Sequence, residues 1–150
     1  MNVVVNPEAN KELASEINEL LSDFIPKTES VRDNCKKINQ ELQYELLQYG
    51  YTPEFVYGLY RVDSIYGWLD PEDFEQSELV KVKDMFGDLS RDSLESYVEQ
   101  LPEKEQEFYL YIPHWFLVVD DLILDAASDM FNCKNSPDRY FDSDCERIIS

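Results

Sequence analysis

Two short apolar runs separated by a pair of aspartates constrain the fold of this chain more than any other feature. They occur in the segment HWFLVVDDLILDAASDMF, which begins at His114. Runs of this length that are rich in Val, Leu and Ile are typical of strands, and adjacent aspartates between them are typical of a turn. The segment therefore predicts an antiparallel hairpin centred between Asp120 and Asp121.

This hairpin brings the single histidine of the chain close to a carboxylate. In the predicted register His114 lies opposite residue 127, and Asp125 lies at the same end of the hairpin with the same parity. Both side chains therefore project from one face of the hairpin. A carboxylate in that position can hold the tautomer and the orientation of an imidazole. An alternative remains, because an Asp that closes a strand is also a common N-cap of a following helical turn, here AASDMF.

A cysteine opens a helical pattern upstream of the hairpin. The segment CKKINQELQYELLQYG begins at Cys35 and ends at Gly50, and it carries one apolar stripe: Ile38, Leu42, Leu46 and Leu47. A thiolate at a helix N-terminus is stabilised by the helix dipole. Positive charge is also concentrated here, on Arg32, Lys36 and Lys37. These features favour a reactive thiol, while the alternative is a small buried side chain that packs like a hydrophobe.

A thiol, an imidazole and a carboxylate are the groups required for nucleophilic acyl chemistry. The three cysteines, Cys35, Cys133 and Cys145, are odd in number and lack even spacing, which argues against a disulfide framework. No CxxC pair is present and the chain has one histidine, so we expect neither a structural zinc site nor another metal or cofactor.

The rest of the chain indicates a single α+β domain that spans residues 1–150. Helical spacing of apolar residues predicts a helix over residues 6–24, with Asn6 as its N-cap, and dense aromatic and β-branched residues predict a strand over 54–63. A second strand region is predicted from residue 107 to the end of the hairpin. The tail from Ser128 begins with a helical turn and is then expected to be irregular.

The acidic stretch between the two strand regions predicts a helical insertion over about residues 64–104. Ser77 and Ser90 precede its two short helical patterns and are candidate N-caps. The insertion lies between the cysteine and the histidine in the chain, so it is a candidate lid or wall of a substrate cleft.

The net charge of the chain makes nucleic acids and anionic membranes unfavourable binding partners. Thirteen basic and 32 acidic residues give a net charge of −19, which repels nucleic-acid phosphates and anionic membranes. The chain has no apolar stretch long enough for a membrane span and no signal peptide at residues 1–12, so we expect a cytoplasmic protein. The acidic surface is compatible with simple solubility, with a basic protein partner, or with mimicry of DNA.

Two segments resemble the papain-like and transglutaminase-like superfamily of cysteine hydrolases. They are NCKKINQELQYELLQYGYTPEFVYGLYRVD, a helix opened by a cysteine and followed by a strand, and the hairpin segment from His114 to Phe131. The resemblance covers residues 34–63 and 107–131. It implies an α+β core in which N-terminal helices pack on a small antiparallel sheet.

The resemblance also implies a role for each residue of the triad. Cys35 would be the nucleophile, His114 the general base and acid, and Asp125 the group that orients the imidazole. The N–H of Cys35 would contribute to an oxyanion hole. The chain departs from the family pattern because it lacks an evident glutamine upstream of the cysteine, and Asn34 is the candidate substitute.

Aromatic residues are candidates for the wall of a substrate cleft, although packing in the core is the more common role of such residues. The candidates are Tyr60, Trp68 and Trp115. The sequence thus favours a cysteine hydrolase or acyltransferase, of protease, deamidase or transglutaminase type, that acts on a protein or peptide. The alternative is an acidic interaction protein without activity, such as a phage-type inhibitor or a DNA mimic.

Overall fold

The predicted hairpin is present and lies at one edge of a small sheet. The structure, a computed structural model, describes residues 2–131 and 133–148. Strand β2 (Tyr111–Val119) pairs antiparallel with β3 (Leu122–Leu124), and Val119 faces Leu122 across the turn. Asp120 has the positive φ of 50° that a tight hairpin turn requires. The register predicted from the aspartate pair is therefore confirmed.

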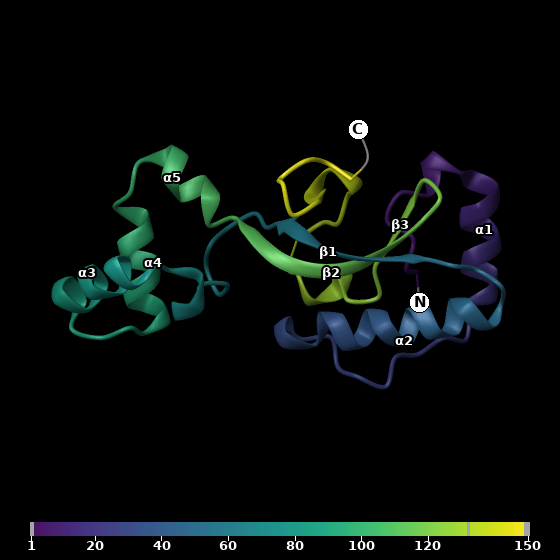
Figure 1. The fold of residues 1–150 in the computed structure, drawn as a ribbon, viewed down its shortest axis with the longest axis horizontal. Coiled ribbons are helices and arrows are strands. Elements are labelled where there is room, and N and C mark those ends of the chain that lie inside the picture. The colour runs from purple at the N-terminus through teal and green to yellow at the C-terminus, as the bar shows by residue number, and fades with distance from the viewer. Residues whose placement is uncertain (1, 132, 149–150) are drawn as a thin grey trace. The chain divides into compact units, whose positions relative to one another are not determined.

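The described residues form a mixed α+β structure (Figure 1). The sheet has the strand order β3-β2-β1-β4, where β1 spans Glu54–Arg61 and β4 spans Tyr140–Phe141. Five α-helices are present in this part of the chain: α1 (Lys11–Leu20), α2 (Cys35–Gln48), α3 (Gln76–Phe86), α4 (Arg91–Glu99) and α5 (Glu103–Phe108). The chain divides into two compact units, of which the second comprises residues 61–112 and the first contains the rest.

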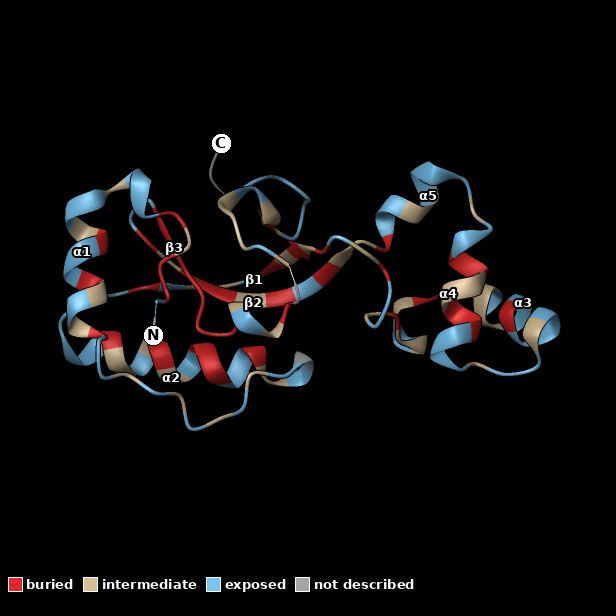
Figure 2. Ribbon diagram, turned by 180° about the vertical axis from the view of Figure 1, so that it is seen from behind, coloured by how far each residue is buried: buried red, intermediate tan, exposed pale blue. Residues whose placement is uncertain are grey.

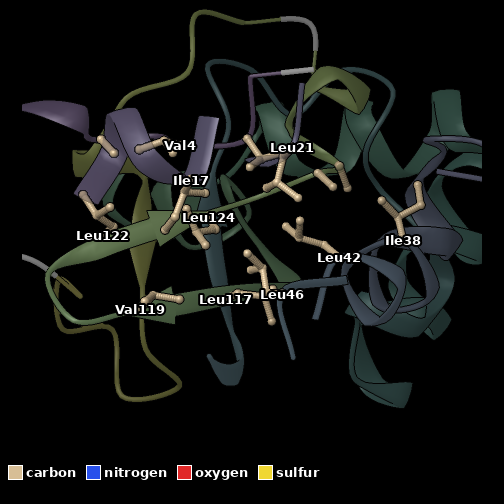
Figure 3. Close-up of a cluster of buried hydrophobic side chains, with 14 of the residues drawn as sticks. Val4, Ile17, Leu21, Ile38, Leu42, Leu46, Leu117, Val119, Leu122 and Leu124 are labelled. Carbon is tan, nitrogen blue, oxygen red and sulfur yellow. The ribbon is translucent and has the colours of Figure 1, made fainter. Parts of the chain in front are cut away.

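Helix α2 is the helix that the apolar stripe predicts. It begins at Cys35, and its buried residues are Cys35, Ile38, Asn39, Leu42 and Leu46. The apolar members of this set belong to one core cluster with Leu117 and Leu124 of the hairpin, and Figure 2 shows the buried segments along α2. The core of the first unit joins α2 to α1 and to the hairpin, with the side chains of Ile17, Leu21, Leu117 and Leu124 among those packed together (Figure 3). Removing these apolar surfaces from water is the main force that fixes α2 on the sheet.

The N-terminal segment differs from the predicted helix over residues 6–24. A 3-10 turn at Pro7–Ala9 precedes α1, and the N-cap of α1 is Asn10, whose side chain accepts a hydrogen bond from the N–H of Leu13 at 3.1 Å. Asn6 does not cap a helix with its side chain. It accepts from the N–H of Ile123 at 2.7 Å and donates to the carbonyl of Asp121 at 2.8 Å. Asn6 therefore ties the N-terminal segment to the outer edge of β3.

The tail forms a strand that the sequence analysis missed. Its helical turn, Ser128–Met130, is present as predicted, but β4 then pairs antiparallel with β1, with Tyr140 opposite Tyr60. Gly58 allows this close approach, because a Cβ at this position would lie 2.2 Å from the carbonyl oxygen of Phe141. The tail is therefore part of the sheet and not an irregular extension.

The expected helical insertion is a unit with its own core, and it is wider than the predicted 64–104. Its buried residues include Leu69, Val82, Leu94 and Val98. Ser90 caps α4 as predicted, but α3 begins at Gln76, so Ser77 is not its N-cap. Residues 107 and 108 are helical and not the start of a strand, because α5 continues to Phe108. None of the helices in the described residues is long and apolar enough to cross a membrane.

The close contact at Gly58 yields a stability prediction. Gly58→Ala should lower the free energy of unfolding by about 1–3 kcal/mol, as overpacking does, because the added methyl group must displace β4. Urea denaturation would measure the loss, and limited proteolysis should show faster cleavage of the segment before β4. Gly87→Ala is the control, since its methyl group meets nothing within 4 Å although its φ of 85° disfavours alanine. Equal proteolysis of the tail in both variants would contradict the role assigned to Gly58.

Candidate active site

Cys35, His114 and Asp125 come from three elements of the first unit, and the structure brings them together. Cys35 is the first residue of α2, His114 lies on β2, and Asp125 directly follows β3. All three are buried: the exposed fraction is 6% for Cys35, 0% for His114 and 1% for Asp125. A cluster of three ionisable side chains inside a core is costly unless the groups are paired.

His114 and Asp125 make the contact that the hairpin parity predicts. The Nε2 atom of His114 lies 2.7 Å from Oδ2 of Asp125, and neither side chain is exposed to solvent. Asp125 reaches the imidazole because β3 ends at Leu124, so the chain turns away from the hairpin at this point. The geometry fixes Nε2 as the nitrogen that carries a proton toward the carboxylate.

The carboxylate of Asp125 has further donors besides His114. Its Oδ1 accepts hydrogen bonds from Nδ2 of Asn39 at 3.1 Å and from the N–H of Ala127 at 2.9 Å. Its Oδ2 also accepts from the hydroxyl of Tyr140 at 2.6 Å. Burial alone would raise the pKa of Asp125, but the charge and hydrogen bond of His114 and the bonds from Tyr140 and Asn39 lower it overall. These contacts favour the ionised form of Asp125. The N-cap of the next turn, Ser128–Met130, is Ala127, so Asp125 does not take the capping role that was the alternative.

The second nitrogen of His114 is available to the thiol. Among the described residues, Nδ1 has no partner within hydrogen-bond distance, although it is buried. Because Nε2 is engaged by Asp125, Nδ1 is the atom through which the ring interacts with Cys35. This looser contact is typical of an active site without substrate.

The thiol and the imidazole shift the pKa values of each other in opposite directions. Burial opposes ionisation of Cys35, but the positive charge of the nearby His114 ring and the N–H of Trp115 lower the pKa of the thiol below its usual value. Burial also opposes protonation of His114, but the charge and hydrogen bond of Asp125 and the contact with Cys35 raise the pKa of the imidazole to about 9. Both shifts favour the thiolate–imidazolium form of the pair over the neutral form.

The start of α2 adds to the stabilisation of the thiolate. The N–H groups in the first turn of a helix lack intrahelical partners, and they place partial positive charge near Cys35. Lys36 and Lys37 are exposed on the same turn. Asn34, the candidate side-chain oxyanion donor, uses its Nδ2 to bond the carbonyl of Glu29 at 3.3 Å. The amide of Asn34 is thus engaged with Glu29, and the backbone donor that acts on the thiol is the N–H of Trp115.

The aromatic cleft candidates have different environments. Tyr60 is fully buried, with its ring stacked on Phe131 at 3.7 Å between centroids, so in this structure its side chain is part of the packed interior. Trp115 is half-buried and stacks on Phe55 and Tyr57, and the ammonium group of Lys36 lies 4.8 Å from its ring centroid. Trp68 belongs to the second unit, where it is half-buried.

Two residues that contact Asp125, Asn39 and Tyr140, were not predicted as site residues from the sequence. Asn39 is a fully buried polar residue within the apolar stripe of α2, one helical turn after Cys35. A polar residue in an apolar stripe indicates a buried hydrogen-bonding partner, so its position in the sequence could have pointed to the site. Tyr140 lies in β4, a strand of only two residues within a polar tail, and its sequence offered no pattern. No group of three metal-ligating side chains suited to a metal ion occurs among the residues the structure describes.

The contact between His114 and Asp125 yields a prediction about the titration of the imidazole. Asp125→Asn should lower the pKa of His114 from about 9, because the neutral amide removes the charge that opposes the effect of burial. Since His114 is the only histidine, the NMR signals of its ring can be followed against pH in a protein without a histidine tag. Asp121→Asn, in the exposed hairpin turn, is the control and should titrate like the wild type. An unchanged pKa in Asp125→Asn would show that the carboxylate does not stabilise the imidazolium.

Comparison with protein-family models, with curated proteins and with solved structures found no match to this chain. The function must therefore be argued from the arrangement of the buried thiol, imidazole and carboxylate themselves.

Proposed function

We propose that this chain is a cysteine-dependent hydrolase or acyltransferase that acts through Cys35, His114 and Asp125. One observation carries the proposal: the buried imidazole of His114 contacts the Asp125 carboxylate at 2.7 Å through Nε2, and its other nitrogen is left for a thiol at a helix N-terminus. A nucleophile, a base and an orienting acid in this order are the parts of a catalytic triad. A core of papain-like or transglutaminase-like type is part of the same proposal.

The proposed reaction has two steps. The Cys35 thiolate attacks the carbonyl carbon of an amide, isopeptide or thioester, and a tetrahedral oxyanion forms near the N–H groups that open α2. His114 then transfers its Nδ1 proton to the leaving amine or thiol, and the carbonyl re-forms as an acyl-enzyme. In the second step His114 takes a proton from water or from an amine, which attacks the acyl group and releases the Cys35 sulfur. Asp125 stays ionised throughout and keeps Nε2 protonated.

The surface charge favours a basic protein or peptide as the substrate. A net charge of −19 attracts cationic chains over distances of about 10 Å at ordinary ionic strength. Lys36 and Lys37 lie beside the sulfur in the sequence, so the immediate surroundings of Cys35 are less acidic than the chain as a whole. Whether water or an amine accepts the acyl group decides between a protease or deamidase and a transglutaminase.

One observation favours a second candidate function. Only 6% of the surface of Cys35 is exposed, and the loop before it is held to the segment after Asp125 by a hydrogen bond from Ser30 to Asp129. Limited access to the sulfur, together with the strongly acidic surface, is compatible with a protein that binds a basic partner without cleaving it. The two candidates differ in whether Cys35 can be acylated.

The proposed function predicts selective acylation of Cys35. With p-nitrophenyl acetate at pH 6.5, intact-mass analysis should show one acetyl group, which peptide mapping should assign to Cys35 and not to Cys133 or Cys145. His114→Ala should slow this acetylation by about 100-fold or more, because the thiol loses its general base. Cys145→Ser is the matched control, since this thiol is exposed and should not contribute.

Iodoacetamide provides an independent measurement of the same thiol. Cys35 should be alkylated at mildly acidic pH much faster than the other two cysteines, because a lowered pKa maintains the thiolate there. Equal reactivity of all three thiols, unaffected by His114→Ala, would overturn the enzyme proposal and favour the acidic interaction protein.

A further inference from the structure

At the open end of the hairpin, the main-chain hydrogen bonding between Trp115 and Ala126 is interrupted. Ile123 and Asp125 direct their N–H groups away from β2: that of Ile123 bonds the side chain of Asn6, and that of Asp125 bonds the carbonyl of Val3 at 2.9 Å. Since the parity alternates along a strand, the main-chain groups of Leu124 and Ala126 point toward β2. Continuing the register of Leu117 with Leu124 makes Trp115 the partner of Ala126.

That pair is not made directly, because the side chain of Asn39 lies between its two members. Nδ2 of Asn39 donates to the carbonyl of Trp115 at 2.8 Å, and Oδ1 of Asn39 accepts from the N–H of Ala126 at 2.9 Å. These are a carbonyl and an N–H that would bond each other in a continuous antiparallel ladder. The carboxamide of Asn39 thus replaces one main-chain hydrogen bond with two, and separates β2 from the chain that leaves β3.

The same side chain also contacts the triad. The second hydrogen of Nδ2 is donated to Oδ1 of Asp125 at 3.1 Å, so Asn39 joins β2, Ala126 and the carboxylate. Because β2 and the chain after β3 are held apart at Trp115, the N–H of Trp115 is not used by the ladder and is directed toward the Cys35 sulfur. Asn39 lies one turn after Cys35 on α2, so its three bonds also fix where the first turn of α2 meets the strand.

We infer that Asn39 is a positioning residue for the triad, whose carboxamide replaces the pairing of Trp115 with Ala126 and thereby holds Asp125 against His114 and the start of α2 against β2. This inference rests on the proposed function. The bonds made by Asn39 need two donors and an acceptor on one short side chain. Aspartate lacks the donors when ionised, and alanine lacks both kinds of group.

The test uses the pH dependence of Cys35 alkylation by iodoacetamide in the full chain. Asn39→Ala and Asn39→Asp should each lower the alkylation rate at pH 6 by about tenfold or more, which corresponds to an upward shift of about one unit in the midpoint of the pH profile. Gln40→Ala removes the neighbouring amide, which is exposed on the same helix, and should leave the profile unchanged. A residue that only fills space in the core would change stability without moving this midpoint.

A measurement on the wild-type protein avoids the risk that the variants do not fold. The side-chain Nδ2 protons of Asn39 should exchange with solvent at least about 100-fold more slowly in NMR experiments than those of exposed Gln40, because both are held in buried hydrogen bonds. Rapid exchange of these protons, or a wild-type pH profile in a folded Asn39 variant, would overturn the inference.

Failure of the proposed function gives a different result. In that case the wild-type Cys35 itself would show the pH profile of an ordinary thiol, whatever the Asn39 variants do. A low midpoint in the wild type that is unchanged in the folded variants would instead reject Asn39 alone and leave the proposed function intact.

Discussion

The pairing of the buried Asp125 carboxylate with its hydrogen-bond donors is the interaction on which the rest of the first unit depends. A charge removed from water costs several kcal/mol unless its oxygens are fully paired. Here the donors come from separate parts of the chain. Strand β2 supplies His114, α2 supplies Asn39 and β4 supplies Tyr140. The N–H of Ala127 is the fourth donor. The charge can be buried only if these segments are assembled together, so the ionised Asp125 couples the geometry of the candidate site to the fold.

Aromatic rings pack around the imidazole of His114 and help to bury it. The rings of Tyr60, Phe131 and Tyr140 lie around His114, with the Tyr60 and Phe131 rings edge-on to the imidazole at 5.7 Å and 4.9 Å between centroids. Exclusion of water strengthens the attraction between the imidazolium and the carboxylate, because the local dielectric is low. Tyr60 therefore contributes to the site as packing around the base.

The sequence was sufficient to predict the parts of the site that lie on elements with a regular apolar pattern, the hairpin and α2. A two-residue turn between apolar runs determines the hairpin register, and this register puts His114 and Asp125 on the same face of the hairpin. The apolar stripe determines that α2 begins at Cys35. The tail strand and the role of Asn6 could not be predicted in this way, because each depends on one or two side chains that find a partner more than 75 residues away. For Asn39, the sequence predicts that it lies on the buried face of α2, but it does not predict its hydrogen bonds to Trp115, Asp125 and Ala126.

The net charge of the chain limits which groups can lower the pKa of Cys35. A thiolate, an imidazolium and a carboxylate together carry one negative charge, and the chain around them has a net charge of −19, so the global field opposes ionisation of Cys35. Such a field is screened over about a Debye length, whereas contacts within the site are not. The lowered pKa of Cys35 therefore arises from nearby groups, chiefly the ring of His114 and the N–H of Trp115. Both lie on β2, so any loosening of α2 from that strand removes both contacts together. For this reason the side chain that holds α2 to β2, Asn39, matters to the thiol although it never touches the sulfur.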